Sequence, residues 1–167
     1  MTTLKEGSLI FDFSRAETAR RLHERGEPFP VGFCDVDFIV DHDGQRWLIE
    51  VKDPDDPGAT DDSKKKFYEK LKGKELIDQS LVPKCRDSYT FLHLMAQDDR
   101  EFLYIVLIAI EDNNPVTQYL GPLRDRLLSR LRKEAKAPWV RHYVKDCIVL
   151  TVDKWNEAFP FPVTRVT

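Results

Sequence analysis

The chain has 167 residues, of which 41% are hydrophobic and 33% charged, and its formal net charge is −3 at pH 7. These values are typical of one folded domain with a substantial core, and we expect residues 1–167 to form a single domain. The negative charge argues against a protein that coats nucleic acid through bulk positive charge. No stretch approaches the roughly 18 apolar residues of a membrane span. The first residues show no apolar signal segment, so a cytoplasmic protein without membrane partners is expected.

The first predicted element is a helix. Ser14 and Glu17 have the spacing of a capping box, in which the serine accepts a hydrogen bond from the first turn and the glutamate reaches back. A helix over residues 15–25 is therefore expected, and Gly26 should end it.

A β-hairpin follows the predicted helix. Residues 31–41 and 45–52 alternate between apolar and polar side chains on either side of Asp43-Gly44, which is a strong hairpin signal. A two-residue loop sets these cross-strand pairs on one polar face: Asp41 with Arg46, Ile39 with Leu48, Asp37 with Glu50, and Asp35 with Lys52. The opposite face should be core, because it collects Cys34, Val36, Phe38, Val40, Trp47, Ile49 and Val51.

The rest of the chain alternates helices with strands, and the whole order predicts an α/β layer protein. The continuous apolar run FLYIVLIAI is typical of a central strand that is covered on both faces. The predicted elements are a charged helix over 64–80, a kink or new helix at Pro83 that continues to Gln97, a strand over 102–110, an amphipathic helix over 117–136, a strand over 146–152, and a brief helix from Asp153 through Trp155.

Three other kinds of site find no support in the sequence. The three cysteines, Cys34, Cys85 and Cys147, lack the CxxC spacing of a zinc site, and we expect reduced core thiols. The four histidines show no HxxxH or HxH spacing. No GxxxxGK[ST] or GxGxxG loop occurs, so nucleotide binding by such a loop is not indicated.

The facing carboxylates Asp37 and Glu50 carry the functional argument. A hairpin with one wet side shows polar alternation without any function, and that reading stays open. Like charges about 5 Å apart nevertheless repel by on the order of 3 kcal/mol at an effective dielectric near 20. A divalent cation such as Mg²⁺ removes this repulsion, because it prefers oxygen ligands. Lys52 points to the same side, and an ammonium beside a metal suits phosphodiester hydrolysis.

With these residues the chain resembles the PD-(D/E)XK nuclease superfamily. The resemblance implies a restriction-endonuclease-like fold, a three-layer α/β/α domain whose mixed central sheet contains the β-hairpin. It also implies that Asp37 and Glu50 bind Mg²⁺ or Mn²⁺, that the Val51 carbonyl adds a ligand, and that Lys52 orients or activates water. Many members add an acidic residue from the first helix. Glu17 is the candidate for that ligand, although its capping-box role explains it equally well.

The family order of helix, three-stranded meander, helix and strand matches residues 14–110 under one condition. Residues 31–41 must supply the middle strand, and Leu9–Phe13 or part of Pro28–Phe33 the first. Val36 stands where the family has its naming proline. Members often place a basic or amide side chain from the next helix near the phosphate, and two residues are candidates, with a solvated helix face as the alternative for both: Lys84 and Arg86.

The resemblance implies a metal-dependent nuclease that hydrolyses phosphodiester bonds, in DNA, as a homodimer or with a partner protein. The alternative is a catalytically silent module of the same fold that acts in binding or assembly, and the net negative charge favours it. A third possibility is an unrelated α/β protein with a wet hairpin.

Overall fold

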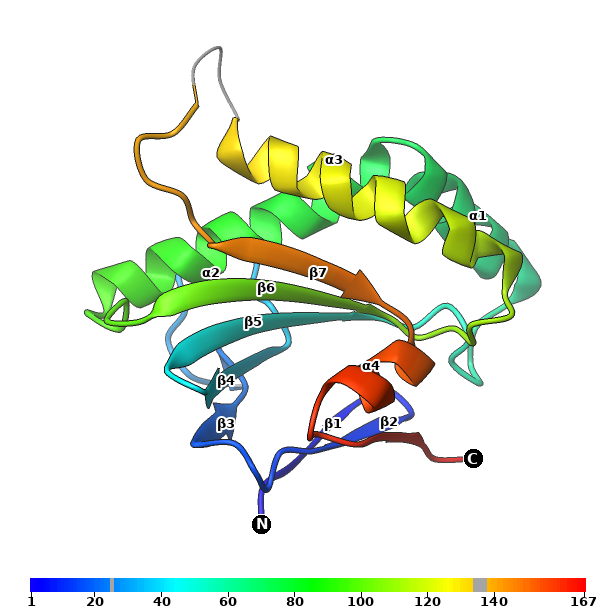
Figure 1. The fold of residues 1–167 in the computed structure, drawn as a ribbon, viewed down its shortest axis with the longest axis horizontal. Helices are drawn as coiled ribbons and strands as arrows, with labels where there is room; N and C mark the ends of the chain where they lie inside the picture. The colour runs from blue at the N-terminus through cyan, green and yellow to red at the C-terminus, as the bar shows by residue number, and fades with distance from the viewer. Residues whose placement is uncertain (25, 134–137) are drawn as a thin grey trace.

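The computed structural model describes residues 1–24, 26–133 and 138–167 (Figure 1). Within these residues the strands form a five-stranded sheet of order β3-β4-β5-β6-β7 and a three-stranded sheet of order β1-β2-β8. The larger sheet contains β3 (Thr18–Arg20), β4 (Phe38–His42), β5 (Gln45–Lys52), β6 (Glu101–Ile108) and β7 (Asp146–Leu150). The smaller sheet contains β1 (Thr3–Glu6), β2 (Leu9–Asp12) and β8 (Val163–Arg165).

The larger sheet is mixed. Its strands β3, β4 and β5 are antiparallel neighbours, whereas β5, β6 and β7 run parallel. Helical crossovers make the parallel connections, as parallel strands require. The helical segments are α1 (Asp61–Lys72), the π-helical η1 (Ile77–Leu81), α2 (Val82–Leu94), the 3₁₀-helical η2 (Pro115–Tyr119), α3 (Leu120–Arg132) and α4 (Val152–Ala158). None of the helices in the described ranges is long and apolar enough to cross a membrane.

The α/β class and the mixed sheet with its hairpin are confirmed. The predicted register holds along the paired part of the hairpin, from His42 opposite Gln45 to Phe38 opposite Ile49. The first strand of the hairpin is shorter than the predicted 31–41, because residues 28–37 form no strand. The predicted pairs of Asp37 with Glu50 and of Asp35 with Lys52 therefore lie beyond the ladder, and Pro28–Phe33 supplies no first strand. Asp43 and Gly44 both have positive φ, 49° and 73°, as a type I′ turn requires. The strand over 102–110 is also confirmed, as β6, which lies between β5 and β7.

The first predicted helix is wrong. Its described residues form turns and the strand β3, and residue 25 lies outside the described ranges. The capping partners are used elsewhere: the Ser14 hydroxyl donates to Asp12, and the Glu17 carboxylate accepts from Arg100. Pairing of β3 with β4 therefore outweighs the local helix signal, and β3 is the first strand of the meander. The alternative first strand over Leu9–Phe13 lies largely in β2 of the small sheet.

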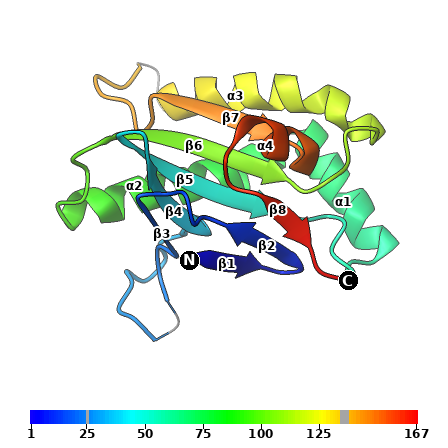
Figure 2. The same ribbon diagram turned by 60° about the horizontal axis from the view of Figure 1, so that its bottom comes forward.

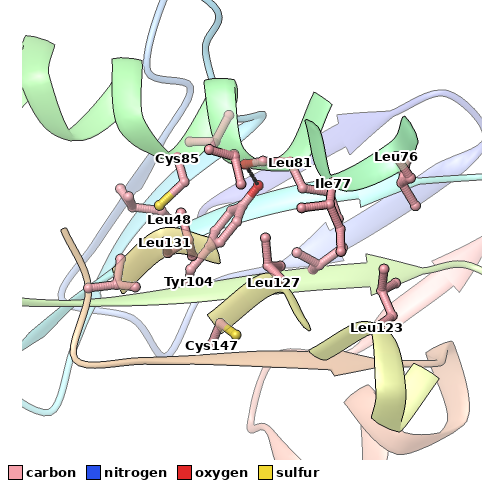
Figure 3. Packing of buried hydrophobic residues seen from close by; sticks show 14 of the residues in the cluster. Leu48, Leu76, Ile77, Leu81, Cys85, Tyr104, Leu123, Leu127, Leu131 and Cys147 are labelled. Atoms are coloured by element: carbon pink, nitrogen blue, oxygen red, sulfur yellow. Dashed lines mark hydrogen bonds between the residues drawn. The ribbon is translucent and has the colours of Figure 1, made fainter. Parts of the chain in front are cut away.

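The polar face predicted for the hairpin is not wet. Helices α1, α2 and α3 cover it (Figure 1), and Ile39 and Leu48 are 2% and 0% exposed there. Figure 3 shows Leu48 and Tyr104 packed against Leu81 of η1 and Leu127 of α3. The apolar pair in the middle of the polar face was the sign of this covering, because two large aliphatic side chains are costly to leave in water.

The other face of the sheet packs on the small sheet and α4 (Figure 2). Its core joins Phe38, Val40 and Ile49 to Phe11 of β2 and Trp155 of α4. The layer expected to be helical is thus a three-stranded sheet with one short helix. A short helix and a small sheet suffice because the hairpin offers a broad aromatic surface to this side.

The remaining elements differ mainly at their ends. The charged helix over 64–80 is α1 followed by η1, and Thr60 caps α1. Pro83 lies at the start of α2, directly after the π-helical turn, which accommodates its missing N–H. Thr151 caps α4 in place of Asp153. Residues 134–136 of the predicted helix over 117–136 lie outside the described ranges.

Candidate functional site

The site lies at the open end of the hairpin, where the pairing of β4 with β5 stops. Asp37 comes directly before β4, and its Oδ2 accepts a hydrogen bond from the backbone N–H of Val51 at 2.7 Å. The side chain of Asp37 thereby takes the place of a backbone carbonyl in the ladder. This bond brings the carboxylate against β5 next to Glu50.

Glu50 is fully buried, at 0% exposed, on the face covered by the helices. Its Oε1 accepts a hydrogen bond from Lys84 Nζ at 2.6 Å and forms an ion pair with Lys52 Nζ at 2.8 Å. Within the described part of the chain, its Oε2 is buried without a hydrogen-bond partner. A buried carboxylate oxygen without a partner is costly, so this atom calls for a ligand or a function.

The two carboxylates influence each other electrostatically. Burial, followed by the negative charge of Glu50, raises the pKa of Asp37 to about 7, although the hydrogen bond from Val51 and the charge of Lys84 act in the opposite direction. The charge of Glu6 on β1 adds a smaller upward contribution to the pKa of Asp37. Close to neutral pH, Asp37 is therefore poised between its two protonation states.

Lys84 shows the complementary effect. Burial lowers the pKa of Lys84, but the charge of Glu50 and the hydrogen bond to it outweigh burial, and the net pKa is raised above its usual value. Asp37 and Asp35 act in the same direction. The ammonium of Lys84 is thus held in the field of both facing carboxylates.

The structure brings together most of the predicted site. Glu50 contacts Lys52 and also Lys84 of α2, the basic residue from the following helix. Asp37 is bonded to the next residue of β5, Val51, and the charges of Glu50 and Lys84 act on it. Successive residues of a strand point their backbone groups to opposite edges. The Lys52 carbonyl accepts a hydrogen bond from the N–H of Ala109, the residue that follows β6, so the backbone groups of Lys52 point toward β6. The N–H and C=O of the preceding residue, Val51, therefore point to the opposite edge of β5, where Asp37 lies.

Three candidates lie elsewhere or pair differently. Glu17 is at the turn end of the hairpin, where its carboxylate accepts from Arg100 at 2.7 Å and from the Gly44 N–H at 3.4 Å. The structure therefore does not bring Glu17 to Asp37. Arg86 donates to Asp87 at 3.1 Å. Asp35 lies 3.9 Å from a ring nitrogen of His23, so the expected pair of Asp35 with Lys52 is replaced by Lys52 with Glu50.

The residues present fit a divalent cation with few protein ligands. In the parts of the chain that the structure describes, no group of three or more His, Cys, Asp or Glu side chains is arranged to hold a metal ion. Mg²⁺ nevertheless binds through one or two carboxylates and keeps several waters. Such a cation would give Oε2 of Glu50 a partner, which it lacks among the described residues. It would also offset the repulsion between the charges of Asp37 and Glu50.

A cavity of about 540 Å³ between η1 and α3 is separate from this site. Two of its basic groups are engaged by the fold: Arg126 donates to the Gly73 carbonyl at 2.8 Å, and Arg130 lies 3.3 Å from Asp78. This cavity therefore brings no reactive group to the facing carboxylates.

Comparison with known proteins gives no match: no family model, no curated protein and no solved structure is similar to the chain. The functional argument therefore depends on the geometry of the site itself.

Proposed function

We propose that the chain is a metal-dependent nuclease of the PD-(D/E)XK type that hydrolyses phosphodiester bonds in DNA. The observation that carries the proposal is the pair of carboxylates at the open end of the hairpin. Asp37 is bonded there to the residue after Glu50, and Oε2 of Glu50 is buried with no hydrogen-bond partner among the described residues. A stable fold with no use for this arrangement would gain by replacing one acid with an apolar or basic side chain.

Each residue of the site has a role in the proposed reaction. Asp37 and Glu50 would hold Mg²⁺ or Mn²⁺, and the Val51 carbonyl faces the same edge. The bound ion would act as a Lewis acid on the phosphate and lower the pKa of a water molecule. Lys52 would donate hydrogen bonds to the phosphate and stabilise its negative charge, and its side chain, 20% exposed, reaches solvent.

The order of elements supports the same proposal. An antiparallel meander of β3, β4 and β5, a helical crossover and the parallel strand β6 follow the family order from the meander onward. The chain departs from that order at its start, where β1 and β2 stand in place of the first helix. In addition, the face below the sheet is covered mainly by β-structure.

DNA is the proposed substrate, and a second copy of the chain or another protein is the proposed partner for cutting both strands. The net charge of −3 means that contact with phosphates must come from local basic groups. The exposed lysines of α1 are candidates for such contacts: Lys65, Lys66, Lys70 and Lys72.

Plasmid DNA incubated with the protein and Mg²⁺ or Mn²⁺ tests the proposal. We expect nicking or linearisation by the wild type and at least a roughly hundredfold loss in Lys52→Ala, since one lost donor to the developing charge costs about that much. Lys145→Ala is the matched control, because its exposed side chain pairs with Glu101 at the turn end of the hairpin, away from the site. Absence of cleavage by the wild type, or equal rates in Lys52→Ala, rejects the nuclease.

One observation favours a catalytically silent module as the second candidate. Both nearby ammonium groups sit on Oε1 of Glu50, so the buried charge is already compensated without a metal. Titration calorimetry separates the two proposals. A silent module should give no Mg²⁺ or Mn²⁺ heat, whereas the nuclease should give a heat that disappears in Asp37→Asn.

A further inference from the structure

We propose that Lys84 is a built-in competitor of the metal ion: its ammonium holds Glu50 in the resting site and must leave when a divalent cation binds. This inference rests on the proposed metal site, and it assigns Lys84 a regulatory role there. Lys84 is then a positioning residue in the resting protein and becomes available to another anion only after displacement.

The position of the Lys84 ammonium is the first step of the argument. Nζ lies 2.6 Å from Oε1 of Glu50, a short charge-assisted contact. Lys84 comes from the first turn of α2, across the site from β5. Its charge acts on Asp37 as well as on Glu50, so a divalent cation that bound both carboxylates would be repelled by this ammonium.

Lys52 does not occupy the same place, although it contacts the same oxygen. Lys52 is two residues from Glu50 on one strand, so their contact at 2.8 Å follows from the strand itself. Lys52 is not among the main influences on Asp37, whereas Lys84 is. Of the two lysines, Lys84 is therefore the one that contacts Glu50 and whose charge also acts on Asp37.

Lys84 has room to move. Its side chain is 26% exposed, whereas that of Glu50 is 0% exposed. The carboxylate of Asp35, 38% exposed, is a second anionic neighbour on the solvent side. A divalent cation would repel the ammonium at short range, and a flexible four-carbon stem lets the ammonium swing outward.

Binding of Mn²⁺ alone tests the inference. The signal of aqueous Mn²⁺ in electron paramagnetic resonance, titrated with protein, gives the dissociation constant without any substrate. We expect Lys84→Met to bind Mn²⁺ at least about tenfold more tightly than the wild type, because a competing positive charge is removed. A lysine that only supports the structure would give unchanged or weaker binding when replaced.

Matched variants make the result specific. Lys145→Met removes the same charge from an exposed pair with Glu101 and should leave the Mn²⁺ affinity within about twofold of the wild type. Lys52→Met should tighten binding less than Lys84→Met. If Lys84→Met does not fold, Lys84→Gln keeps a hydrogen-bond donor toward Glu50 without the charge, and the same tightening is expected.

The outcomes are decisive in each direction. Equal or weaker binding by the Lys84 variants, equal tightening by Lys52→Met, or no Mn²⁺ binding by any variant overturns the inference. Tighter binding by the Lys84 variants supports it even if plasmid DNA is never cut. In that case the nuclease proposal fails and the competition between Lys84 and the metal stands.

Discussion

The acidic residues at the two ends of the hairpin have opposite electrostatic environments. At the turn end, Asp41 faces Arg46, which donates to both its carboxylate oxygens at 2.7 and 3.0 Å. Thr18 of β3 adds a third hydrogen bond at 2.9 Å. At the open end, Asp37 instead feels the charge of another acid, Glu50, whose Oε2 is buried with no partner among the described residues.

This difference separates a structural ion pair from a candidate site within a few residues of the same strands. Burial raises the pKa of Asp41, but the hydrogen bonds from Arg46 and Thr18 outweigh it and hold the pKa below its usual value. Burial and the charge of Glu50 instead raise the pKa of Asp37 to about 7. Acids whose pKa is raised by burial and by a neighbouring negative charge, as for Asp37, are concentrated at functional sites.

The largest expected effect concerns Asp37 and pH. Its folded pKa of about 7 lies above its ordinary value of 3.8, so the folded state binds the proton more tightly. The free energy of unfolding should therefore fall as pH rises from about 4 to about 7, by up to on the order of 4 kcal/mol. Asp37→Asn keeps an oxygen for the Val51 N–H and lacks the charge, so it should be more stable than the wild type near pH 8. Urea unfolding near pH 5 and pH 8 measures both effects.

If the free energy of unfolding changed with pH equally in the wild type and Asp37→Asn, the contrast between the two ends would be contradicted. Addition of Mn²⁺ near pH 8 provides a second test of the same contrast. The ion should raise the melting temperature of the wild type and have little effect on Asp37→Asn, because only the wild type offers both carboxylates.

The second prediction concerns the ion pair of Asp41 with Arg46 at the turn end. Asp41→Asn should lower the free energy of unfolding at neutral pH by about 2–3 kcal/mol, since Arg46 is left largely buried beside a neutral amide. Because the folded pKa of Asp41 is lowered, its contribution is present above 3.8 and is lost as pH falls through the folded value. Urea unfolding of Asp99→Asn is the control: that side chain is 71% exposed beside the same arginine. Equal losses in both variants would refute the distinction.

Tyr104 tests the buried sheet surface between the two ends. Its hydroxyl is fully buried and donates to the Leu81 carbonyl at 2.9 Å (Figure 3). Tyr104→Phe should cost about 1–2 kcal/mol, because the carbonyl of η1 loses a partner away from water. Tyr119→Phe retains its ring beneath Lys72 and should cost much less by the same unfolding measurement. A negligible loss in Tyr104→Phe would show that this bond is dispensable.

The smallest effect is expected at Glu17. Its carboxylate binds Arg100 and the Gly44 N–H at the turn end. Glu17→Gln should therefore leave Mn²⁺ affinity and plasmid cleavage unchanged. A marked loss of Mn²⁺ affinity would show that Glu17 takes part in metal binding and would contradict its assignment to the turn end alone.

Local chemistry made a large part of the hairpin predictable. Asp43-Gly44 specifies a two-residue turn, and period-two alternation then fixes which residues are opposite each other. Asp37, Glu50 and Lys52 were placed together by this register alone. Lys84 was a candidate only through the family resemblance, because no local pattern reveals where a helix residue will point across a crossover.

The sequence by itself determined the α/β order, the register of the hairpin and the meeting of two acids, because turn chemistry and alternation act between neighbouring residues. Only the tertiary structure decided that β3 replaces the predicted helix, since pairing with β4 outweighs a capping signal. It also decided that helices bury Glu50 and bring Lys84 onto it. The burial of a side chain and the charges around it depend on which elements pack together, and that packing is determined by the whole chain rather than by neighbouring residues.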